Sequence, residues 1–266
     1  MFRGSRKHVL DWTSRPEFCV DLLQLVRPAD CQITAQSKWM PRGYRYPDEA
    51  RLETFGPEVL PNPEIWANLR RWWLVHERGA NTPNWDIAAG CEIDGRTGFI
   101  LVEAKANVPE LSALGKTLDR SASKASVENH ERIAAAITEA CSALRHLGAI
   151  TAISRDSHYQ LSNRVAFAWK LATLGIPTVL VYLGFLGDDG IADAGPPFSG
   201  SAHWETVFSK YASSVVPESM FERRSECGLA PVWFLVRSRR VIEISPARPT
   251  NIPQPGVESD ASSESR

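Results

Sequence analysis

The feature that most constrains the fold is a sharp turn between two apolar runs, at Asp94-Gly95-Arg96-Thr97. Asp-Gly between alternating apolar residues is a strong hairpin signal, because these two residues reach positive φ angles at low cost. The flanking runs, 85–93 and 98–106, have the length of ordinary strands. The sequence therefore predicts an antiparallel hairpin, and with it a sheet on which the remaining chain must pack.

Helical and apolar patterns surround this hairpin. Asn62-Pro63-Glu64 combines an N-cap, a first-turn proline and a first-turn acid, and helical spacing of apolar residues continues to about Arg78. Two more helices, a buried strand and a late pair of strands are predicted, in that order, over 126–147, 159–174, 176–185 and 232–245. This order predicts an α/β fold of three layers, with a mixed central sheet flanked by helices.

The two ends of the chain differ from this middle part. Residues 1–61 are predicted to form an N-terminal extension that is partly loop-like, with one short helix over 18–26. Residues 62–245 are predicted to form one domain. The Pro/Ser-rich tail 246–266 has almost no large apolar residues, so we expect it to be disordered.

Composition narrows the class of protein. A chain of 266 residues with 43% hydrophobic residues can bury one full-sized core. The formal net charge of -1 gives no global positive field, so nucleic-acid binding would need a local basic groove. Five scattered cysteines without a Cys-x-x-Cys pair, and a start without an apolar run, predict a cytoplasmic protein with reduced thiols. No apolar stretch is long enough to span a bilayer.

The second strand of the hairpin changes character along its length. Strand alternation places Phe99, Leu101, Glu103 and Lys105 on one face. Because that face begins with large apolar residues, the two charges come at the end of a strand that looks buried. Charges in such a place are costly unless other groups pair with them.

The register of the hairpin decides what faces these charges. A four-residue loop at 94–97 puts Asp86 opposite Lys105, whereas a two-residue loop at 94–95 puts Asp86 opposite Glu103. Both registers place Asp86 on the face of the two charges, and only a three-residue loop would turn it away. The sequence therefore predicts two carboxylates and an ammonium at one end of the sheet.

This trio suits metal-assisted chemistry at a phosphate. Mg²⁺ prefers oxygen ligands and keeps several water molecules. Asp86 and Glu103 would bind the metal, with Mn²⁺ as a substitute, and Lys105 would either help to deprotonate a water or stabilise the developing negative charge. The alternative is an ordinary cross-strand pairing of a lysine with carboxylates at the end of a hairpin.

The spacing of Asp86 and Glu103-Ala104-Lys105 resembles the core motif of the PD-(D/E)xK nuclease superfamily. The resemblance extends from Asn62 to Phe185. It departs from the family pattern at Trp85, where the motif has a proline that is often absent. It also departs in having two helices before the buried strand, which indicates an insertion. The resemblance implies a three-layer restriction-endonuclease-like core, catalytic roles for the trio, and Mg²⁺-dependent hydrolysis of phosphodiester bonds in DNA or, less often, RNA.

The resemblance implies accessory residues as well. Some members place a glutamate on the first helix, for which Glu64 or Glu77 would serve, Glu64 being favoured although a first-turn dipole role also explains it. Some members place a glutamine on the helix after the Glu-x-Lys strand, and Gln160 stands there. Asn163 and Arg164 near the same helix start would contact a phosphate.

Several other residues have competing explanations. The segment with Lys116, Arg120 and Lys124 is either a mobile loop that meets a phosphate backbone or a plain solvated loop. Ser126 is expected to cap a helix, and His130 to be solvated near its start. Tryptophans are expected in the core rather than as stacking platforms for bases, namely Trp66, Trp72, Trp73, Trp85 and Trp169.

The predicted partner is nucleic acid, with DNA favoured over RNA, and no membrane; a homodimer or larger assembly is left open. Two other functions remain: a degenerate nuclease fold that binds nucleic acid or a protein without cutting, and a hydrolase of small phosphorylated substrates.

Overall fold

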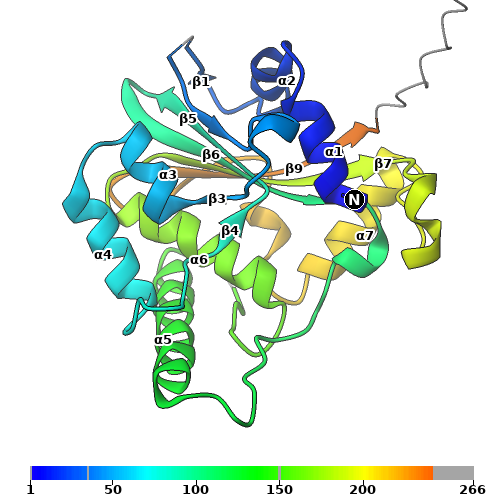
Figure 1. Ribbon diagram of the computed structural model, residues 1–266. Coiled ribbons are helices and arrows are strands. Elements are labelled where there is room, and N and C mark those ends of the chain that lie inside the picture. The colour runs from blue at the N-terminus through cyan, green and yellow to red at the C-terminus, as the bar shows by residue number, and fades with distance from the viewer. Residues whose placement is uncertain (1, 35, 149–150, 242–266) are drawn as a thin grey trace, which may run out of the picture.

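The computed structural model describes residues 2–34, 36–148 and 151–241, which form an α/β fold around a mixed, curled sheet (Figure 1). Its strands are β1 (Cys31–Gln32), β2 (Trp39–Met40), β5 (Ile87–Ile93), β6 (Arg96–Lys105), β7 (Thr178–Leu186), β8 (Arg224–Glu226) and β9 (Pro231–Arg240). The strand order is β1-β5-β6-β7-β9-β8, and β2 also pairs with β5. Strands β6, β7 and β9 run parallel, whereas β5 and β8 run antiparallel to their neighbours. A separate small sheet joins β3 (Ala50–Arg51) to β4 (Asn84–Trp85).

Helices cover both faces of the main sheet, which gives three layers. The helices are α1 (Gly4–Thr13), α2 (Phe18–Leu25), α3 (Leu52–Val59), α4 (Pro63–Trp73), α5 (Lys124–His146), α6 (Tyr159–Thr173) and α7 (Ser201–Ala212). Short 3-10 turns are η1 (Gly43–Arg45), η2 (Val108–Glu110), η3 (Asp189–Ala194) and η4 (Glu218–Met220). Helices α1 and α2 pack on one face, and α3 to α7 contribute to the core on the other (Figure 1).

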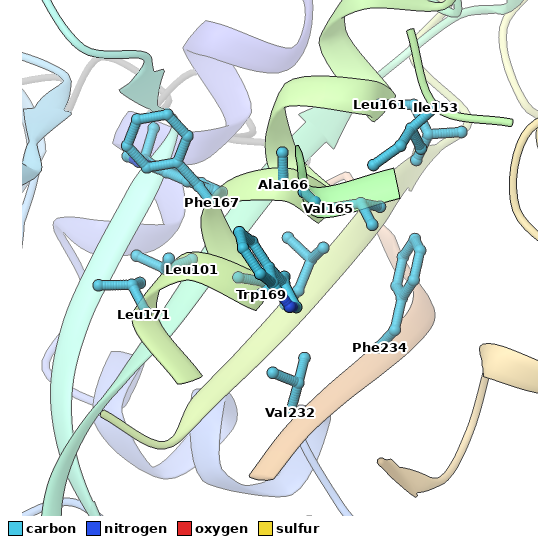
Figure 2. Packing of buried hydrophobic residues seen from close by; sticks show 14 of the residues in the cluster. Leu101, Ile153, Leu161, Val165, Ala166, Phe167, Trp169, Leu171, Val232 and Phe234 are labelled. Carbon is cyan, nitrogen blue, oxygen red and sulfur yellow. The ribbon is translucent and has the colours of Figure 1, made fainter. Parts of the chain in front are cut away.

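Strand alternation sorts β6 between the two cores. Phe99 and Leu101 belong to the core under α4 to α7, whereas Ile100 and Val102 belong to the core under α1 and α2. Figure 2 shows Trp169 of α6 and its neighbours packed over the sheet beside Leu101. Glu103 and Lys105 continue the face of Phe99 and Leu101, as predicted, so they lie beneath α6.

The prediction of an α/β fold with a mixed central sheet between helices is confirmed. The hairpin has a two-residue turn, because Ile93 pairs with Arg96, and both turn residues have positive φ, 51° at Asp94 and 71° at Gly95. The four-residue loop is therefore wrong, and the register that extends from Ile87–Val102 places Asp86 beside Glu103. The five tryptophans expected in the core are buried.

Three predicted boundaries differ from the structure. Helix α4 ends at Trp73 rather than near Arg78, because the side-chain oxygen of Asn129 accepts hydrogen bonds from the backbone of Val75 and His76. Ser123 rather than Ser126 caps α5, and its hydroxyl accepts from the amide of residue 126.

The late pair of strands is also different, since β9 is one long strand whose partner β8 precedes it in the chain. Residues 242–245 and the tail 246–266 lie outside the described residues.

The N-terminal segment is more ordered than predicted. The short helix expected at 18–26 is present as α2, but α1 and α3 were not expected. Val9 and Trp12 of α1 are fully buried against the sheet, so this segment supplies one face of the core. The boundary at residue 62 stays a prediction. Within the described residues, no helix has the length and apolar character needed to cross a membrane.

Candidate functional site

A cavity of about 630 Å³ opens where β6 ends, and the predicted trio lies in its wall. Strand β6 supplies Glu103 and Lys105, and Asp86 stands between β4 and β5. The first two turns of helix α6 also line the cavity, through Tyr159, Gln160, Asn163 and Arg164. Ser5 and Arg6 of α1 also line the cavity. Segments far apart in the sequence therefore converge at this point.

Asp86 is held by the backbone rather than by a cation. Its Oδ2 accepts a hydrogen bond of 2.8 Å from the amide of Ala104. Among the described residues it forms no ion pair. Burial, followed by the nearby charge of Glu103, raises the pKa of Asp86 to about 7. Its negative charge is therefore poorly balanced, in contrast to that of Glu103.

Glu103 is in the opposite situation, since each of its oxygens contacts a cation. Lys105 Nζ lies 2.6 Å from Oε1, and the Arg164 guanidinium lies 2.6–2.7 Å from Oε2 through two of its nitrogens. Burial alone would raise the pKa of Glu103, but Arg164 and Lys105 hold it at about 2. Glu103 is therefore ionised across the physiological range, although it is only 3% exposed.

Lys105 is buried and stays charged. Burial alone would lower the pKa of its ammonium, but the carboxylates of Glu103 and Asp86 raise it above its ordinary value. Gln160 Oε1 accepts a second hydrogen bond from Nζ, at 3.0 Å. The predicted approach of Gln160 to the trio is thus present in the structure, and its amide fixes the direction of the ammonium.

Arg164 is held by other groups of the protein, and its predicted contact with a phosphate stays a prediction. Its guanidinium is buried, donates to the carbonyl of Asn84 at 2.6 Å, and lies 4.4 Å over the ring of Trp85. Asn163 accepts from it at 2.9 Å. Both residues line the cavity, but Arg164 is engaged by Glu103. Sequence spacing could not reveal this, because the pair joins α6 to β6 across the fold.

The two candidate glutamates of the predicted first helix lie elsewhere. Glu64 is an exposed first-turn residue of α4, and Glu77 forms an exposed ion pair with Arg70. Neither lines the cavity. Helix α1, which the sequence did not predict, reaches the cavity through Ser5 and Arg6.

Two carboxylates at the cavity were missed from the sequence. Glu49 lies 3.8 Å from Arg6, and Glu110 accepts from the backbone amide of Ala106. Both stand in irregular or short elements with no periodic signal.

The basic segment after β6 divides into two parts. Lys116 lines the cavity, with its ammonium 5.1 Å from the ring centroid of Tyr159. Arg120 is exposed outside the cavity, and Lys124 is the exposed first residue of α5. His130 is buried rather than solvated, because the loop carrying Arg155 packs over the start of α5.

The donors available for a metal are few. Among residues 2–34, 36–148 and 151–241, no group of three or more His, Cys, Asp or Glu side chains is arranged to hold one. Asp86 and Glu103 are the two carboxylates that the hairpin brings together. A pair of carboxylates fits Mg²⁺, which proteins commonly bind through one or two carboxylates while water and substrate complete the shell.

Comparison of the chain with protein-family models, with curated proteins and with solved structures found no match.

Proposed function

We propose that this protein is a Mg²⁺-dependent nuclease with a restriction-endonuclease-like core, which hydrolyses phosphodiester bonds of DNA or RNA. The observation that carries the proposal is that Asp86, Glu103, Lys105 and Gln160 line one open cavity at the end of a buried strand. Burying these charges is costly, and a fold gains nothing from placing them around a cavity unless something binds there. The order of α4, the hairpin, α5, α6 and β7 is compatible with such a core.

Asp86 and Glu103 would hold the metal. The carboxyl group of Asp86 has no cation paired with it among the described residues. Glu103 would bind the metal through oxygen atoms that already accept hydrogen bonds from Lys105 and Arg164. When bound, Mg²⁺ would supply an activated water and neutralise charge on the phosphate. Mn²⁺ would replace it.

Lys105 and Gln160 would act on the substrate side of the site. The raised pKa of Lys105 keeps the ammonium charged, so charge stabilisation of the phosphate is favoured over proton abstraction. Gln160 accepts a second hydrogen bond from Nζ, beside the one to Glu103, and so fixes the position of the ammonium. The buried Arg164 adds a second positive charge, in contact with Oε2 of Glu103.

The test compares wild-type protein with Glu103→Gln and Lys105→Met on single- and double-stranded DNA and on RNA, with Mg²⁺ or Mn²⁺. We expect cleavage to fall by about 10²–10³-fold or more in each variant. Glu64→Gln is the matched control, because it removes the same charge outside the cavity and should cut at the wild-type rate. Equal cleavage by all four proteins would refute the proposal.

A second candidate function is binding of nucleic acid or a protein without cutting. It is favoured by one observation: Lys105 and Arg164 already neutralise both oxygens of Glu103. In that case neither Mg²⁺ nor Mn²⁺ would shift the melting temperature of wild type, and no substrate would be cut. A metal-dependent shift that Asp86→Asn abolishes would instead support the nuclease.

A further inference from the structure

Beside the cavity lies a group of exposed aromatic and arginine side chains, which we call the aromatic–arginine surface: Phe2, Arg42, Tyr44, Arg45 and Tyr46. Its three rings are 43%, 49% and 53% exposed, in the order Phe2, Tyr44, Tyr46. Rings with this much exposed apolar area are unusual outside binding surfaces when several occur together.

The surface is built on a fixed support. The amide of Gly43 donates to Thr13 Oγ1 at the end of α1, and Tyr44 OH donates to Asp11 Oδ1 at 2.7 Å. The amide of Arg42 donates to the carbonyl of Tyr46, which closes the turn. Gly43 has φ of 60° and sits directly against Ser14, where a side chain would collide. The rings are therefore held out from α1 in a defined arrangement.

The surface is continuous with the cavity. Arg6 lines the cavity, and its guanidinium lies 5.9 Å from the ring centroid of Phe2, which in turn lies 6.3 Å from that of Tyr44. A second hollow of about 440 Å³ shares Arg6, Glu49 and Asn84 with the cavity. It is also lined by Met40 and Asp48, which flank the turn that carries the tyrosines.

The charges on this side favour an anion. Among the described residues, Arg42 and Arg45 form no ion pair, and Arg45 lies 5.4 Å over the ring of Tyr46. Arg6 Nη1 has no hydrogen-bond partner there, and its nearest carboxylate, on Glu49, is 3.8 Å away. Asp48 and Glu49 oppose these charges in part, so the attraction is local and moderate.

We propose that the aromatic–arginine surface binds a single-stranded stretch of nucleic acid and leads it to the cavity; this rests on the proposed function. Exposed rings stack on bases of any sequence, and nearby arginines follow the phosphates. A duplex hides its base faces inside the stack, so it cannot use the rings except at an end. The surface thus selects single strands or frayed ends.

The test measures binding of fluorescent oligo(dT), oligo(rU) and a blunt duplex to the full-length protein in EDTA, where nothing is cut. We expect Tyr44→Ala/Tyr46→Ala to weaken binding of a single-stranded oligonucleotide by about 5- to 100-fold. Tyr46→Phe should stay within about twofold of wild type, because its ring remains and the hydrogen bond from Tyr44 to Asp11 is kept. Arg42→Ala/Arg45→Ala should reduce the slope of log affinity against log salt by about 1.4.

The outcomes separate this inference from the nuclease proposal. If Tyr44→Ala/Tyr46→Ala unfolds as wild type does and binds single strands with unchanged affinity, the proposed role of the aromatic–arginine surface is refuted. This holds even if the protein cuts nucleic acid. Equal weakening of duplex and single strand also overturns it. If the alanine variant loses affinity for single strands but wild type never cuts, the inference about the aromatic–arginine surface is supported. Only the nuclease proposal is then refuted.

Discussion

Two groups of buried charges lie against opposite faces of the sheet. Under α6, Glu103 meets Lys105 and Arg164 beside the cavity. Under α1, His8 Nε2 lies 2.7 Å from Asp188 Oδ2, close enough for an ion pair but not aligned as a hydrogen bond. All five residues are less than a tenth exposed. Burial of charge therefore does not by itself distinguish a functional site from a structural tie.

The difference lies in what surrounds each group. The pair under α1 joins that helix to η3, and neither of its members lines the cavity. The group under α6 lines an open cavity and has a neighbour, Asp86, whose charge no cation contacts directly. A cavity combined with unbalanced charge is the arrangement that a ligand would complete.

The largest expected effect separates buried from surface pairs. Glu103→Gln leaves Lys105 and Arg164 without their carboxylate, so we expect the free energy of unfolding to fall by about 3–5 kcal/mol. Asp94→Asn breaks a half-exposed pair with Arg224 and should cost at most about 1 kcal/mol. Urea unfolding of both variants measures the difference, and similar losses would mean that Glu103 is not held as tightly as its contacts indicate.

The second effect concerns Asp86, whose replacement should stabilise the protein, whereas replacement of Glu103 should destabilise it. Because its native pKa of about 7 lies above the ordinary value of 3.8, the folded protein holds this proton more tightly than the unfolded chain. The free energy of unfolding should therefore fall as pH rises from about 4 to 7, and level off above. Asp86→Asn lacks this loss, so between pH 5 and pH 8 its free energy of unfolding should rise by about 2–3 kcal/mol relative to wild type.

Urea unfolding of both proteins at the two pH values provides the measurement. A difference that does not change with pH would show that Asp86 ionises normally. Mg²⁺ at pH 8 should recover part of the lost stability in wild type but not in Asp86→Asn.

The pair under α1 should respond in stability alone. His8→Phe keeps an aromatic ring beside Phe185, whose centroid lies 5.3 Å from that of His8, but leaves the buried Asp188 carboxyl group without its imidazole partner. We expect a loss of about 1–2 kcal/mol and an unchanged rate of cleavage per folded molecule. A large fall in the cleavage rate, with the fold intact, would mean that His8 and Asp188 belong to the functional site. The two groups of buried side chains would then not differ in function.

These contrasts also show what local sequence can predict. The hairpin, α5, α6 and β7 were predictable because turn chemistry and periodicity agree with the tertiary structure there. Alternation alone placed Glu103 and Lys105 on the face of Phe99 and Leu101. Where the signal was local, the α/β fold and the placement of Asp86, Glu103 and Lys105 at one end of the sheet were predicted correctly, whereas their catalytic role stays a prediction.

The failures have a common physical cause, which is contact between distant segments. Helix α3 contains Gly56-Pro57, a local breaker signal, yet Trp66 packs against the glycine and stabilises the helix. The role of Arg164 depended on its distance from Glu103, which no spacing encodes. Arg6 reaches the cavity only because α1 packs on the sheet.

The smallest effect tests a buried polar group that belongs to neither cluster. Tyr182 pairs with Glu103 in the parallel register of β6 and β7, is fully buried, and its hydroxyl has no hydrogen-bond partner among the described residues. An unpaired buried hydroxyl is costly, so Tyr182→Phe should raise the free energy of unfolding by about 1 kcal/mol without changing cleavage. Urea unfolding measures this gain. A loss instead would show that the hydroxyl is bonded in solution, and that the polar region around Glu103 extends under the sheet beyond the cavity.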